Sequence, residues 1–136
     1  MIRIAAIDHI VLRVREPQPM VEFYCRVLGC TVERKMDEIG LVQLRAGSSL
    51  IDLIAFDGPL GRAGGAPPGA AGRNLDHFCL RLEGFEEAAV RAHLAACGIV
   101  AGETASRYGA EGSGPSIYIA DPEGNTVELK GPPWPR

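Results

Sequence analysis

The sequence predicts an α+β fold that contains the same β-α-β-β-β module twice. The main observation is a repeat, because IDHIVLRV at residues 7–14 returns as LDHFCLRL at residues 75–82. A second repeat closes each half, where Asp52 lies in the apolar run LIDLIAF and Glu128 lies in TVELK. Each half therefore opens with a histidine strand and ends with a carboxylate strand, which is the pattern of a duplicated unit.

The first module is expected at residues 5–57, and each of its elements has a local signal. The β-branched residues of IDHIVLRV indicate a strand. The next segment, EPQPMVEFYCRVLG, has prolines that suit a first helical turn, apolar residues at helical spacing, and Gly29 as a natural helix end. CTVERKMD and GLVQLRA are predicted strands, and the turn AGSS leads into SLIDLIAF.

The second module, at residues 75–131, repeats this order within one domain spanning 1–136. After LDHFCLRL come a helix in FEEAAVRAHLAACG, a short strand around Val100 to Glu103, the glycine-rich loop SRYGAEGSG, the strand PSIYIA, the turn DPEGN and the strand TVELK. A short tail, 132–136, follows. The Gly, Pro and Ala residues of 58–74 indicate a linker, and its length also suits a mobile lid.

Composition and charge exclude several classes of function. The chain has 136 residues, 46% of them hydrophobic, which is sufficient for a real core. Its net charge of −3 leaves no strongly basic face for nucleic acid. Charged residues interrupt the apolar N-terminal segment, so we expect neither a signal peptide nor a membrane span, and we expect a cytoplasmic protein.

The repeated strands each present one polar face. Because side chains alternate along a strand, His9, Val11 and Arg13 lie on one face. The other face, with Ile10, Leu12 and Val14, is expected to pack on the helix. His77 and Arg81 repeat this arrangement in the second module. In each closing strand the carboxylate projects opposite its apolar neighbours. Each module is therefore expected to present one histidine and one carboxylate on the sheet face away from its helix.

Two neutral imidazoles and two carboxylates make a nitrogen and oxygen donor set that suits a divalent first-row metal. Without a cation, two carboxylates brought together would repel each other. A single histidine or carboxylate in a strand is usually structural or solvated, but this pair occurs in both halves. The predicted metal ligands are His9, Asp52, His77 and Glu128.

The sequence resembles the vicinal oxygen chelate superfamily, which contains glyoxalases, bleomycin-resistance proteins and extradiol dioxygenases. The resemblance is carried by DHIVLRV with MVEFYCRVLG after it, by DHFCLRL after the linker, and by SIYIADPEGNTVELK. It implies two modules whose sheets form an incomplete barrel around a metal, with His9, His77 and Glu128 as ligands. Asp52 takes the place where glyoxalase I enzymes carry a glutamate. Because aspartate is shorter, it can bind directly, bind through a water, or leave three protein ligands.

The resemblance also implies roles in catalysis and in substrate binding. Glu128 is the first candidate for the base that moves a carbon-bound proton, and Asp52 is the second. Arg13 lies where bacterial-type glyoxalase I enzymes place an arginine that holds a glutathione carboxylate, and Arg81, its repeat partner, would hold a second anionic group. For both arginines an ion pair with a nearby acidic residue is the alternative. Tyr118 is a candidate substrate contact, with packing as its alternative.

Three functions are compatible with this resemblance. The first is a metal-dependent lyase or isomerase similar to lactoylglutathione lyase, acting on a glutathione hemithioacetal. The second is a thiol transferase, an epimerase or an extradiol dioxygenase, for which His9, His77 and Glu128 are sufficient. The third is a metal-free protein that sequesters a drug, against which the four predicted ligands of this chain argue. The metal could be nickel, zinc, manganese or iron, and a homodimer is expected, with the barrel closing within one chain or between two.

Overall fold

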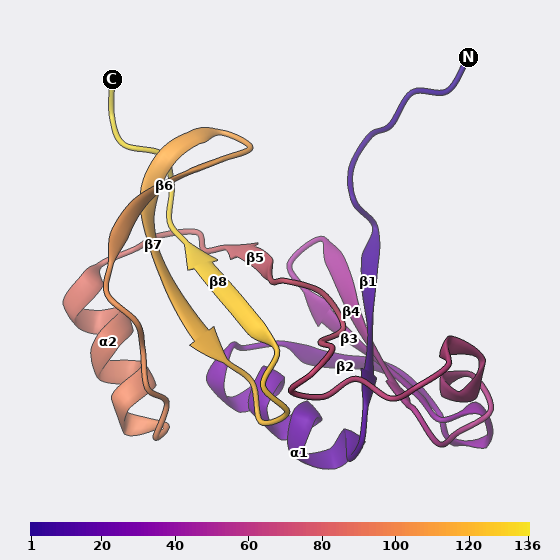
Figure 1. Ribbon diagram of the computed structural model, residues 1–136. Coiled ribbons are helices and arrows are strands. Elements are labelled where there is room, and N and C mark those ends of the chain that lie inside the picture. Colours follow the sequence, from indigo (N-terminus) through magenta and orange to yellow (C-terminus); the bar gives the residue numbers. More distant parts are fainter. The chain divides into compact units, whose positions relative to one another are not determined.

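The computed structural model describes residues 1–136 as two compact units, residues 1–74 and residues 75–136 (Figure 1). Each unit combines one open four-stranded sheet with helical segments. The predicted α+β class and the repeated β-α-β-β-β order are therefore confirmed. None of the helices is both long enough and apolar enough to cross a membrane.

The first unit has the predicted order of elements. They are β1 (His9–Val14), α1 (Pro17–Glu22), the π-helical turn η1 (Phe23–Val27), β2 (Thr31–Met36), the 3-10 turn η2 (Asp37–Ile39), β3 (Leu41–Ala46), β4 (Ser49–Ala55) and the 3-10 turn η3 (Gly61–Gly64). The strand order in the sheet is β1-β4-β3-β2, with β1 and β4 parallel and the other pairs antiparallel.

Alternation along β1 separates the core of the first unit from its polar face. Leu12 and Val14 are fully buried, whereas Val11, which precedes Leu12, remains 45% exposed. The helical segments add Met20 and Tyr24, which are also fully buried. The side chains that bear the candidate chemistry thus lie on the face opposite the packed layer, as the period of two predicts.

The second unit repeats this sheet with the same strand order. Its elements are β5 (Phe78–Arg81), α2 (Glu87–Ala96), β6 (Ala105–Gly109), β7 (Gly112–Ala120) and β8 (Thr126–Lys130), and the strand order is β5-β8-β7-β6. The parallel pair is β5 and β8, matching β1 and β4 of the first unit. Both units therefore place the opening and closing strands of the module side by side.

Two predictions about the segment before β7 are wrong. The short strand expected at Val100–Glu103 is irregular, and Val100 is 90% exposed. The strand of this region is instead β6. The segment SRYGAEGSG, predicted as a loop, forms most of the β6–β7 hairpin, in which the paired residues run from Ala105 and Ser116 to Gly109 and Gly112. Pairing with β7 determines which residues form β6. The local sequence does not indicate this strand, because the glycines at the turn have a low strand propensity.

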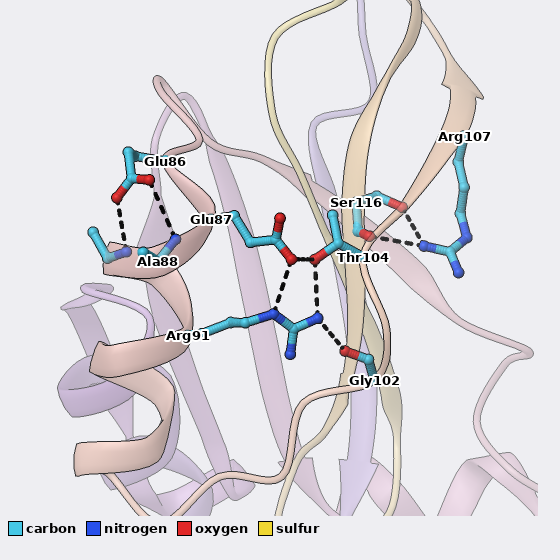
Figure 2. Close-up of polar contacts among 9 residues, drawn as sticks. Glu86, Glu87, Ala88, Arg91, Gly102, Thr104, Arg107 and Ser116 are labelled. Atoms are coloured by element: carbon cyan, nitrogen blue, oxygen red, sulfur yellow. Dashed lines mark hydrogen bonds and ion pairs between the residues drawn. The ribbon is translucent and has the colours of Figure 1, made fainter.

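A polar network holds α2 to the segment before β6 (Figure 2). Glu86 caps the helix by accepting from the amides of Ala88 and Ala89. Arg91 donates to Glu87, and it also donates to the Thr104 hydroxyl, which in turn donates to Glu87 at 2.7 Å. The hydrogen bonds from Thr104 and then from Arg91 lower the pKa of Glu87. The irregular segment is therefore fixed by side chains.

Candidate functional site

The first histidine–carboxylate pair lies on β1 and β4. The register pairs Val11 with Asp52, so His9, two residues earlier in β1, shares the face of Asp52. The Nδ1 atom of His9 lies 2.7 Å from an oxygen of Asp8. This hydrogen bond, and then the negative charge of Asp52, raise the pKa of His9. Each oxygen of the buried Asp52 accepts from the amide nitrogen of Gln43 at 3.1 Å.

The second pair lies beside β5 and on β8. The Nε2 atom of His77 lies 3.3 Å from an oxygen of Glu128, and its Nδ1 lies 2.6 Å from an oxygen of Asp76. Glu128 is buried, and its register partners are Cys79 on β5 and Tyr118 on β7. The Tyr118 ring meets the His77 ring edge-on, with centroids 5.3 Å apart. The predicted histidine and carboxylate are therefore neighbours within this unit.

Two further groups surround Glu128. Burial, followed by the charge of Glu128, raises the pKa of the Cys79 thiol to about 11, so this thiol is protonated at neutral pH. The same two causes raise the pKa of Tyr118, and a hydrogen bond with Glu128 adds to them. Both groups therefore face Glu128 as neutral hydrogen-bonding side chains and do not compete with it as a base.

The aspartates before the two histidines are functional candidates that the sequence reasoning did not assign. Asp8 and Asp76 each contact the Nδ1 atom of the next residue, His9 or His77. A carboxylate at Nδ1 fixes the ring and leaves Nε2 for a metal, which is the usual environment of a metal-binding histidine. The signal was present as the repeated dipeptide Asp-His. Imidazole nitrogens and buried carboxylates are suitable ligands for a divalent cation. Neither unit alone brings together three side chains of these types.

Arg13 holds the predicted linker in place. Its backbone N–H donates to the Asn74 side-chain oxygen, and its carbonyl accepts from the Asn74 amide, both at 3.0 Å. The guanidinium donates to the carbonyls of Gly65 and Ala66 at 3.1 and 2.8 Å. Gly64 packs so closely that a Cβ there would lie 2.4 Å from an Arg13 nitrogen. The residue predicted to hold a substrate carboxylate thus donates to backbone carbonyls in this structure.

We expect Arg13→Met to increase the rate of tryptic cleavage after Arg62 and Arg73 several-fold. Loss of the charge-assisted hydrogen bonds removes on the order of 1.5–3 kcal/mol each from the attachment of this segment. Local opening, which precedes cleavage, then becomes more frequent. Cleavage is followed by mass spectrometry at short digestion times. Arg45→Met, on β3, is the control and should leave both rates unchanged; equal rates in Arg13→Met and the unmodified protein would show that Arg13 does not hold the linker.

Arg81 and Arg107 complete the description of the second unit. Arg81 donates to Glu111 at 2.7 Å and also to the Leu82 carbonyl, so the ion-pair alternative describes it here. Arg107, which the sequence reasoning missed, lies over the Tyr118 ring at 4.4 Å from its centroid. A single arginine in a glycine-rich stretch gives no sequence signal for such a position.

Comparisons with known proteins agree with this architecture. Residues 6–129 match the family model described as the Glyoxalase/Bleomycin resistance protein/Dioxygenase superfamily. A virulence protein from Salmonella typhimurium is 25% identical, with 96% of this chain and 98% of that chain covered and a TM-score of 0.77.

Two other solved structures have the same fold at lower identity. Lactoylglutathione lyase from Agrobacterium tumefaciens is 23% identical, with 93% of each chain covered and a TM-score of 0.68. TnmS3, an antibiotic binding protein from Streptomyces sp. CB03234, is 18% identical, with 97% of this chain and 99% of that chain covered and a TM-score of 0.71. One fold thus serves both an enzyme and a binding protein.

Proposed function

This chain belongs to the Glyoxalase/Bleomycin resistance protein/Dioxygenase superfamily, and from this premise we propose that it is a metal-dependent lyase or isomerase. Its substrate would be a small molecule that chelates the metal through neighbouring oxygens, with a glutathione hemithioacetal as the first candidate. The observation that supports the proposal best is the recurrence of a histidine, its aspartate partner and a buried carboxylate at equivalent positions in both units.

We propose that both pairs bind one divalent metal ion, with ligands from one chain or from two copies of it. The ligands are His9, Asp52, His77 and Glu128. Two imidazole nitrogens and two carboxylates suit nickel, zinc, manganese or iron. When bound, the metal would act as a Lewis acid that stabilises negative charge on the substrate oxygens.

The contacts of the two carboxylates favour different roles for them. Both oxygens of Asp52 accept from one Gln43 amide group, and Gln43 in turn accepts from Arg34 at 2.7 Å. This chain of hydrogen bonds fixes the orientation of the Asp52 carboxylate, which suits a metal ligand. Glu128 instead has the neutral Tyr118 beside it. We therefore assign Glu128 as the base that takes the carbon-bound proton and returns it to the neighbouring carbon.

The test is the metal content of protein that is stripped with a chelator and then loaded separately with each of the four metals. We expect stoichiometric binding of at least one metal, and we expect His9→Ala and His77→Ala each to lose it. His93→Ala, on α2, is the control and should retain full binding. The loaded protein is then assayed with methylglyoxal and glutathione. Failure of the unmodified protein to bind any metal would reject the proposal in favour of a metal-free drug-binding protein.

A further inference from the structure

Arg107 is a fixed cation without an acidic partner. Its Nη1 atom donates to the carbonyl and the hydroxyl of Ser116 at 2.9 and 2.7 Å (Figure 2). Its guanidinium stacks on Tyr118. No carboxylate contacts it, and its remaining N–H groups have no acceptor in the structure. A guanidinium that is held on one edge and open on the other is preorganised to bind an oxyanion.

Lys130 is a second cation on the same sheet face. It follows Glu128 by two residues on β8, and the register pairs it with Ser116. A Cβ on Gly114 would lie 3.1 Å from its Nζ atom, and Gly114 is the register partner of Arg107. The Lys130 side chain therefore extends across β7 toward Arg107.

The Lys130 ammonium also lacks an acidic partner, although the residue is only 5% exposed. Burial of an unpaired charge is unfavourable, and buried charges are normally paired. No side-chain nitrogen that is sealed from solvent lacks a hydrogen-bond partner. The ammonium therefore keeps access to solvent, and so to a ligand.

The glycines of the β6–β7 hairpin make this position possible. A Cβ on Gly109 would lie 2.9 Å from the Cε atom of Lys130, which is too close for an unshifted side chain. The absence of side chains at Gly109 and Gly114 thus leaves room for Lys130 to extend over the hairpin. The glycine-rich segment, which was predicted as a loop, instead accommodates a buried cation.

We propose that Arg107 and Lys130, which both adjoin the buried Ser116, bind the carboxylate or phosphate group of the substrate. That the anion belongs to the substrate rests on the proposed function, whereas anion binding itself does not. The Tyr118 ring lies 4.4 Å from Arg107 and 5.3 Å from the His77 ring, measured to its centroid. A small molecule with chelating oxygens at one end and an anionic group at the other spans this single ring.

The test measures anion binding by the metal-free protein. Inorganic phosphate and acetate are titrated separately, and the shift in Tm and the backbone amide NMR shifts are recorded. We expect at least one anion to stabilise the protein, and Arg107→Met and Lys130→Met each to weaken this binding about tenfold, as expected when one charge-assisted hydrogen bond is lost. A stronger response to acetate identifies a carboxylate substrate, and a stronger response to phosphate identifies a phosphorylated one.

Lys130→Met also separates a ligand-binding role from a structural one. If the ammonium serves only a ligand, its replacement by an apolar side chain leaves Tm without anion equal to or above that of the unmodified protein. Arg45→Met, which removes an arginine paired with Glu33 in the first unit, is the control and should keep the full response. An unchanged anion response in both Arg107→Met and Lys130→Met, or no response of the unmodified protein to either anion, would overturn the proposal. If the unmodified protein binds no metal but its response to the anion depends on Arg107, the proposed function is rejected and the oxyanion site is retained.

Discussion

Replacing Leu12 with alanine is expected to lower the free energy of unfolding by about 3–5 kcal/mol. Leu12 is fully buried at the centre of β1. Alanine there loses the transfer free energy of the removed carbons and leaves a cavity that the surrounding side chains fill only in part. Urea denaturation followed by circular dichroism measures the change. A loss of this size on a natural domain removes a large fraction of its stability.

The neighbouring residue and the repeat partner serve as controls. Val11→Ala, one position earlier and 45% exposed, should cost less than about 1 kcal/mol. Leu80→Ala occupies the equivalent position in β5, but Leu80 is only partly buried, so its cost should lie between the two. If Val11→Ala cost as much as Leu12→Ala, the assignment of the core face of β1 would be wrong.

The face of each repeated strand could be predicted because strand alternation is a local property. In the first unit Leu12 is buried and Val11 is exposed, as alternation along IDHIVLRV requires. The closing strand behaves in the same way, because Val127 and Leu129 are buried in the core while Glu128 lies beside His77 on the other face. Side-chain period and sequence repetition were sufficient for the element order and for these faces.

The position of β6 could not be predicted from local signals. Ala105–Gly109 contains few strand-forming residues, and it becomes a strand because β7 offers a matching edge. The attachment of the linker to Arg13 was equally hidden, because its partners are mainly backbone carbonyls, which every residue carries. Long-range pairing and backbone acceptors leave no motif in a sequence.

The candidate site was predictable in its residue types and only partly in its contacts. Within the second unit the predicted His77 and Glu128 lie 3.3 Å apart, and within the first His9 and Asp52 share a face. That the two pairs bind one metal remains a prediction. The partners of these residues, Gln43 on β3 and the aspartates before the histidines, depend on side-chain directions that only the folded sheet defines.

Asp76→Asn is expected to weaken binding of the proposed metal about tenfold. The Asp76 carboxylate lies 2.6 Å from Nδ1 of His77, where it orients the ring and leaves Nε2 for the metal. Such partners typically contribute roughly 10–100-fold to metal affinity. The Asp76 side chain is 96% exposed, so water can replace part of its effect, and the lower end of this range applies.

Asp8→Asn provides the same test in the first unit with a second observable. The hydrogen bond that His9 donates to Asp8 is the largest cause that raises the pKa of His9, so the pKa measured by NMR for metal-free protein should fall in this variant. Asp37→Asn removes the same charge from an exposed turn and should change neither metal affinity nor the His9 pKa. Competition titration with a chromogenic chelator gives the affinities. A reduced His9 pKa with unchanged affinity would show that Asp8 contacts a histidine that is not a ligand, and the first unit would then contribute at most Asp52.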